Sequence, residues 1–251
     1  MDLDRLPAEL LQLFRTAPDS PPVLPSPLPR HVVLASSFHT EPEASYAWLQ
    51  RIADSDPRGP LRNFEFWMSE FEERTGRQLE ADLIDSLGER GWLFLLEGDA
   101  VHTLNAVGIF EARDPGLLDG TLSDLLHWIG DQAQGRTLGL VSPQVTGNSM
   151  NFRTPFGEFP GPAFELRDGH LLIGTSPQAL VEGGKLLRTR KHWQPTRPAV
   201  PVTPRFANES VRISGPALAR WLDWEPHLDT IALDVWYTGD TIRISGKAEF
   251  Q

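Results

Sequence analysis

The chain contains no cysteine among its 251 residues. This absence excludes disulfide bonds, thiolate nucleophiles and cysteine-ligated metal sites. It is compatible with an exported bacterial protein and equally with a cytosolic one, so it leaves the compartment open.

Long apolar segments are also missing. No run approaches the roughly 20 residues that a helix needs to cross a bilayer, and residues 1–30 lack the profile of a signal peptide. We therefore expect no transmembrane segment in this chain. A periplasmic or envelope location is expected if a leader or anchor has been removed, and a cytoplasmic location otherwise.

The signatures of common catalytic sites are absent as well. The chain has no phosphate-binding glycine-rich loop, no dinucleotide fingerprint and no zinc-protease helix motif. The nearest approach is Ser176, which stands at a strand-to-helix turn. Because Gln178 occupies the place where a nucleophile elbow needs a small residue, Ser176 before Pro177 is better explained as a helix N-cap. We predict no catalytic residue and no cofactor.

Other polar groupings favour solvated positions. Glu225, His227 and Asp229 alternate as metal ligands on one side of a strand would, but Pro226 between them favours a solvated loop. Paired acidic residues on the predicted helices are typical of a solvent-facing surface. We predict no metal site.

The charge balance limits the choice of partner. The formal net charge is −11, from 23 basic and 34 acidic residues, which argues against nucleic acid and anionic lipid as general partners. One segment nevertheless concentrates positive charge around a tryptophan. The members of this predicted partner patch are Lys185, Arg188, Arg190, Lys191, Trp193 and Arg197. It is interpreted either as a docking site for an acidic protein or lipid headgroup, or as a solvated helix end whose cations suit the helix dipole.

The most informative apolar stretch covers residues 61–96. Its first apolar residues have the i, i+3, i+4, i+7 spacing of a helix face: Phe64, Trp67, Met68 and Phe71. Gly76 is expected to end this helix, and a second helix is expected from about Leu79 to Gly88. The continuous apolar run 91–96 then predicts a central strand that is buried on both faces.

Four segments share a second pattern, in which a strand leads into a capping residue and a helix with proline in its first turn. They are 31–42, 104–115, 170–177 and 211–216. Hairpin turns are predicted at Asp168-Gly169 and at Gly239-Asp240. The closing hairpin alternates apolar and polar residues, so one of its faces is expected to be packed and the other wet. Together these patterns predict an α+β fold with a largely antiparallel, twisted sheet and helices mainly on one face.

The predicted domain organisation is simple. Residues 1–30 form a short helix and a proline-rich arm, which either docks on the domain or reaches a partner. Residues 31–251 form a single α+β domain, since no break in composition divides them.

Two segments carry a family resemblance. Residues 75–83 read Thr-Gly-Arg-Gln-Leu-Glu-Ala-Asp-Leu, and residues 168–176 read Asp-Gly-His-Leu-Leu-Ile-Gly-Thr-Ser. In this order, and with the closing hairpin, they resemble an uncharacterised bacterial family, domain of unknown function 3352, over residues 30–250. The resemblance implies an exported or membrane-anchored envelope protein, although members are often longer and carry an N-terminal anchor that this chain lacks. The family has no agreed activity, so it assigns no catalytic residue.

The leading functional hypothesis is a non-catalytic binding or scaffolding module of the bacterial cell envelope, or an accessory subunit of a membrane-associated assembly, with a protein partner. The alternative is a small-molecule or lipid binder with an apolar pocket between sheet and helices, lined by residues such as Trp67, Phe71 and Trp92. An unrecognised hydrolase is a third, remote alternative. A filled core beside a broad exposed patch favours the first hypothesis, and a large apolar cavity favours the second.

One further aromatic group has two interpretations. Phe152, Phe156 and Phe159 lie in a region rich in proline and glycine. They form either an exposed apolar site or the packing beneath a long loop.

Overall fold

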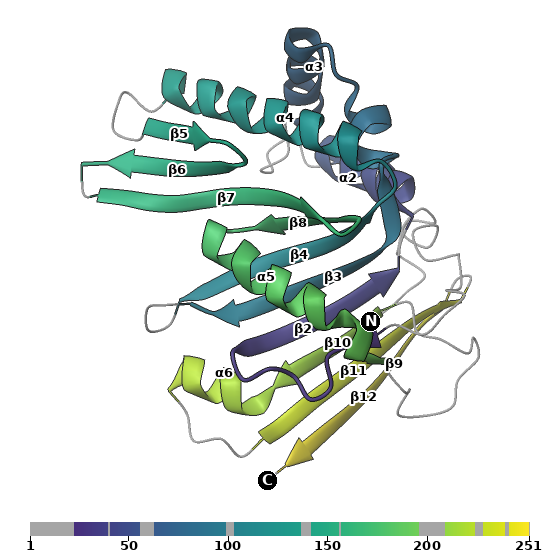
Figure 1. The fold of residues 1–251 in the computed structure, drawn as a ribbon. Coiled ribbons are helices and arrows are strands. Elements are labelled where there is room, and N and C mark those ends of the chain that lie inside the picture. Colours follow the sequence, from purple (N-terminus) through teal and green to yellow (C-terminus); the bar gives the residue numbers. More distant parts are fainter. Residues whose placement is uncertain are drawn as a thin grey trace.

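The computed structural model describes residues 23–39, 41–55, 63–98, 103–136, 142–155, 157–195, 209–223, 228–238 and 241–250. These residues form a ten-stranded sheet with helices packed around it, and a separate pair of short strands, β1 and β9 (Figure 1). The strand order in the large sheet is β12-β11-β10-β2-β3-β4-β8-β7-β6-β5, and every pairing between described strands is antiparallel. The predicted α+β class with a largely antiparallel sheet is confirmed.

The elements follow one another along the chain in this order: β1 (Val23–Leu24), β2 (Val32–His39), α2 (Pro42–Ser55), α3 (Phe64–Thr75), the π-helix η2 (Leu79–Ile84), β3 (Leu87–Glu97), β4 (Leu104–Ala112), α4 (Pro115–Arg136), β5 (Ser142–Thr146), β6 (Ser149–Thr154), β7 (Gly157–Arg167), β8 (His170–Gly174), α5 (Pro177–Thr189), the 3₁₀ helix η3 (Arg190–His192), β9 (Gln194–Pro195), β10 (Glu209–Ser214), α6 (Gly215–Leu222), β11 (Leu228–Thr238) and β12 (Thr241–Phe250).

Helix starts and hairpin turns follow the local sequence signals. The Ser176 hydroxyl accepts a hydrogen bond from the backbone N–H of Ala179 at 3.2 Å, which confirms the N-cap. Asp168 and Gly169 have φ angles of 52° and 72°, as a two-residue hairpin between β7 and β8 requires. Gly76 also has positive φ, and it ends α3 as predicted.

The second predicted helix is shorter than expected. It ends as a π-helix at Ile84, and Leu87 already belongs to β3, where it pairs with Ala112 of β4. The carbonyl of Ser86 accepts hydrogen bonds from the backbone N–H groups that follow β4. The prediction of a helix up to Gly88 was therefore wrong, because pairing with β4 takes over before the helical pattern ends.

Helices lie on both faces of the sheet, whereas the sequence predicted them mainly on one. Ile109 of β4 pairs with Leu172 of β8, and both pack beneath α5. The neighbouring pair, Phe110 and Leu171, packs against α4. Because adjacent residues of a strand point to opposite faces, α4 and α5 cover opposite sides, here called the α4 face and the α5 face.

Two glycines bring α5 close to the sheet. A Cβ atom on Gly183 would lie 2.7 Å from Cγ2 of Val107, and both Gly183 and Gly184 are buried. The Gly-Gly pair therefore serves close packing, although glycine lowers the intrinsic stability of a helix.

The central strand β3 is buried on one face only. On the α5 face, Trp92, Phe94 and Leu96 are almost completely buried. On the α4 face, Leu93 is 39% exposed and Leu95 is half-buried. The prediction of burial on both faces was therefore wrong.

The described end of the proline-rich arm docks on the domain. Val23 and Leu24 pair with β9, and Leu24 belongs to the largest hydrophobic cluster. The indole N–H of Trp92 donates a hydrogen bond to the carbonyl of Val23 at 3.0 Å. Residues 1–22, including the short helix predicted there, lie outside the described residues.

Candidate functional site

The predicted partner patch is only partly at the surface. Lys185, Arg188 and Lys191 are exposed along the end of α5 and on η3. The ammonium group of Lys185 donates to Oε1 of Glu182 at 2.7 Å, which offsets part of its charge. Arg197 lies outside the described residues.

The other two members of the patch turn inward. The guanidinium of Arg190 lies 4.3 Å from the centre of the Trp92 ring and donates to Oε1 of Glu111 at 3.2 Å. Trp193 is only 8% exposed, and it packs edge-on against Trp92 and Phe94. Its place in the predicted surface patch was therefore wrong, because its ring belongs to the core beneath η3. A partner at the remaining cations stays a prediction.

The predicted apolar pocket is also not formed by the residues named for it. Trp67 and Phe71 pack with Trp128 of α4, whereas Trp92 belongs to the separate cluster beneath α5. Phe71 and Trp92 are 0% and 1% exposed. All three contribute to filled cores, so a pocket lined by them was a wrong prediction.

The phenylalanine group divides in the same way. Phe152 is half-buried against the α4 cluster, and Phe159 is 51% exposed. Phe156 lies outside the described residues. No common aromatic site follows from the two described side chains.

Of the alternating residues for which a solvated loop was predicted, only Asp229 is described, and it is exposed in β11; Glu225 and His227 lie outside the described residues. Within the described ranges, no group of three or more possible ligands is placed to hold a metal ion.

Among the helices of the described residues, none has both the length and the apolar character that a membrane span requires.

An open groove of about 540 Å³ lies at one end of β3 and β4. Its ionisable lining residues are His39, Glu89, Arg90, Glu111, Arg113 and His170. The carboxylate of Glu89 is 3.3 Å from Nε2 of His39 and 3.2 Å from Arg113, while Glu111 is bound by Arg190. Both acids are therefore held in ion pairs at the groove wall.

A broad apolar surface lies on the α4 face of β2, β3, β10, β11 and β12. One cross-strand row joins Ala248, Ile231, Ile213, Leu34 and Leu95, which are directly opposite one another across five strands. Directly opposed residues point to the same side of a sheet. The apolar members of this surface, here called the open face, are Leu34, Leu93, Leu95, Val211, Ile213, Ile231, Leu233, Val235, Ile244 and Ala248.

The open face remains accessible to solvent. Leu93 and Ile244 are 39% and 69% exposed, and the other aliphatic members from β2, β3, β10 and β11 are half-buried. None of them belongs to the hydrophobic clusters found in the described part of the chain. The surface also reaches β12, the last strand of the sheet as described. It is therefore an apolar sheet face next to a sheet edge.

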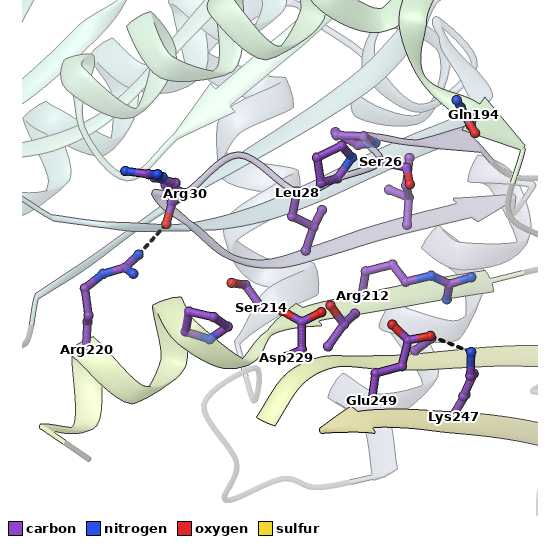
Figure 2. A pocket seen from close by; sticks show the side chains of 16 residues that line it. Ser26, Leu28, Arg30, Gln194, Arg212, Ser214, Arg220, Asp229, Lys247 and Glu249 are labelled. Carbon is purple, nitrogen blue, oxygen red and sulfur yellow. Dashed lines mark hydrogen bonds and ion pairs between the residues drawn. The ribbon is translucent and has the colours of Figure 1, made fainter. Parts of the chain in front are cut away.

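On the opposite face, β10, β11 and β12 carry mainly polar side chains and form the floor of a groove of about 740 Å³ (Figure 2). One wall is the arm segment 25–30, and another is α6, which contributes Pro216 and Arg220. Arg220 donates to the carbonyl of Arg30 at 2.5 Å and to Glu97 at 3.0 Å, so it ties α6 to the arm and to β3. The groove thus depends on contacts between parts of the chain that are distant in sequence.

Three residues form a hydrogen-bonded network in this floor. Ser210 donates to Oδ1 of Asp234 at 2.7 Å, and Nη1 of Arg212 donates to the same oxygen at 3.1 Å. Asp234 and Ser210 are almost fully buried, while the side chain of Arg212 is 15% exposed and lines the groove. A buried carboxylate is stable only when paired and hydrogen-bonded, and this one is both.

Lys247 and Glu249 complete the floor from β12. They form an ion pair with each other, and the hydrogen bond and charge of Lys247 lower the pKa of Glu249 below its ordinary value. Sequence analysis missed Arg212, Asp234 and Lys247 as possible site residues. The available signal was the polar alternation in the closing hairpin, but the pairing of β10 with β11 is not readable from it.

Comparison of the chain with protein-family models, with curated proteins and with solved structures finds no significant match, so the resemblance to domain of unknown function 3352 stays a prediction.

Proposed function

We propose that this protein is a non-catalytic binding module that associates with a partner protein through the open face. The observation that carries the proposal is the exposed apolar surface across five strands, which includes the hydrogen-bonded polar pair Ser36 and Glu209 and lies beside packed hydrophobic clusters. Contiguous exposed apolar patches are rare on monomeric soluble proteins and are typical of interaction surfaces.

The shape of the surface supports a partner that brings a β-strand. β12 ends the described sheet, and an edge strand offers unpaired N–H and C=O groups to another chain. Ile244 and Phe250 of β12 are 69% and 74% exposed, so an added strand with apolar side chains on one side would continue the open face. Main-chain hydrogen bonds would then supply affinity, and the apolar rows would supply specificity.

Site-specific photo-crosslinking in the native organism tests this proposal. A photoreactive side chain replaces Leu93 on the open face, and in a control it replaces Val181, which is 48% exposed on α5. We expect one defined protein to be crosslinked at Leu93 and not at Val181. The predicted envelope setting rests on the family resemblance alone, and the experiment is informative in any compartment.

The dissociation constant of the complex with the purified partner then tests whether the open face is the binding surface. Ile244→Lys places a charge at the edge of the open face and should raise the dissociation constant about tenfold or more, since 1.4 kcal/mol corresponds to tenfold. Val181→Lys should leave the dissociation constant unchanged. Equal crosslinking at both positions, or unaltered binding by Ile244→Lys, would contradict the proposal. A crosslinked product with the mass of two chains would replace the partner protein with a second copy.

A further inference from the structure

We propose that the 740 Å³ groove between the arm, α6 and the C-terminal hairpin binds a small molecule that carries an oxyanion, a carboxylate or a phosphate, on an apolar body. This site lies on the α5 face and is independent of the open face. Its anchor is Arg212, and Lys247 provides the second positive charge.

Hydrogen bonds within the protein hold the side chain of Arg212 in place. Nη1 donates to the carbonyl of Val211 at 2.9 Å as well as to Asp234, which is in turn held by Ser210. These contacts fix the orientation of the guanidinium before any ligand arrives. A planar group held in this way loses little conformational entropy when it binds an anion.

Donors of Arg212 are left for a ligand. A guanidinium has five N–H bonds, and the hydrogen bonds within the described part of the chain use only Nη1. Nε and Nη2 therefore have no partner among the described residues. Two adjacent donors in one plane match the two oxygens of a carboxylate or phosphate.

The surroundings of Arg212 suit an oxyanion. Figure 2 shows the side chains of Arg212 and Lys247 extending toward the same end of the groove, while Arg30 and Arg220 lie at the other end. Glu249 already binds the ammonium group of Lys247, so it acts as an internal competitor that a ligand must displace. Asp229, the other acid in the lining, lies near α6, away from the Arg212 guanidinium in this view.

Apolar residues in the lining of the groove are the reason for proposing that the ligand has an apolar body. The arm contributes Pro25, Pro27 and Leu28 to the wall, and Ala232 lies in the floor between polar neighbours. The groove thus has cationic side chains at both ends, and the apolar residues of the arm form part of its wall. A bare inorganic ion would leave this wall unused, whereas an organic acid would cover it.

An NMR titration of the full chain tests the site. The probes are benzoate, inorganic phosphate and benzamide, the last being a neutral analogue of benzoate, all at constant ionic strength. We expect saturable shifts at Arg212 Nε–H, Ala232 and Leu28 with benzoate or with phosphate, and none with benzamide. Tighter binding of benzoate identifies a carboxylate site, and tighter binding of phosphate identifies a phosphate site.

Single substitutions test which side chains contribute to the affinity for the anion. Lys247→Met should weaken binding of the better anion about tenfold, and Glu249→Gln should strengthen it several-fold because the competitor is removed. Lys185→Met is the matched control, since Lys185 is also an exposed lysine paired with a glutamate, and it should have no effect. Arg212→Lys keeps the charge opposite Asp234 but loses the planar fork, and should weaken binding about tenfold.

Several results would overturn the inference. They are an equal response to benzamide, anion-induced shifts outside the groove, or unchanged binding in Lys247→Met. Lys247 and Glu249 are exposed, so their variants are expected to fold and keep the test decisive even if Arg212→Lys does not fold.

Discussion

Adjacent residues of β3 should respond very differently to the same truncation. Phe94 is 0% exposed in the cluster beneath α5, whereas Leu93 is 39% exposed on the open face. Phe94→Ala removes a buried ring and leaves a cavity, which costs about 3–5 kcal/mol. Leu93→Ala removes apolar atoms that are already partly in water and leaves no enclosed cavity, so we expect a loss of roughly 1 kcal/mol or less.

Urea unfolding of dilute protein measures the two differences. Dilution keeps the open face free of partners or second copies, and unchanged m-values would show that the two variants unfold from similar native states. A loss of more than about 3 kcal/mol in Leu93→Ala would equal the cost of a buried leucine. That result would refute the open face, because it would require another part of the chain to cover Leu93 in solution.

Three further predictions concern local features of the fold. Ser176→Ala should lower the free energy of unfolding by about 1 kcal/mol in urea titrations, because the N-cap of α5 loses its acceptor. Gly183→Ala should destabilise by about 1–3 kcal/mol because its Cβ would meet Val107 at 2.7 Å, whereas Gly116→Ala, with only ordinary contacts, should be neutral or stabilising. Burial, with the nearby charge of glutamates, raises the pKa of Tyr46 above its ordinary value of 10.0, so the folded state holds this proton more tightly than the unfolded state. Stability should therefore fall as the pH rises above about 10, and Tyr46→Phe should reduce that fall in pH-dependent thermal unfolding.

Features decided within a few residues could be predicted from the sequence. Ser176 before Pro177, the Asp168-Gly169 turn and Gly76 each act through their own backbone and the adjacent N–H or C=O groups. The segment 104–115 was predicted to lead from a strand into a helix with proline in its first turn, and β4 indeed ends at Ala112 shortly before α4 begins at Pro115. Such local signals do not depend on how distant segments of the chain pack.

Features decided by distant segments could not be predicted in the same way. The run 91–96 is apolar at every position after Gly91, which is compatible with burial on two faces or on one. Whether Leu93 is covered depends on where α4 runs, and the spacing of α4 contains no information about that. Trp193 was misplaced for the same reason, because its position beside basic residues says nothing of Trp92, its partner about a hundred residues earlier.

The closing hairpin shows most clearly how the two faces are used. Its alternation predicted one packed and one wet face, and an ordinary fold would pack the apolar side. The structure instead buries Asp234 and Ser210 beneath the groove, while Ile244 on the apolar side is 69% exposed. Burying a carboxylate requires the paired arginine and serine, and a simple hydrophobic replacement would often be as stable. A polar network kept inside and an aliphatic surface kept outside both oppose stability of the isolated chain. The burial of polar side chains and the exposure of aliphatic ones are most simply explained if both faces bind ligands. In that case Arg212 binds a small anionic molecule, and the open face binds a partner protein.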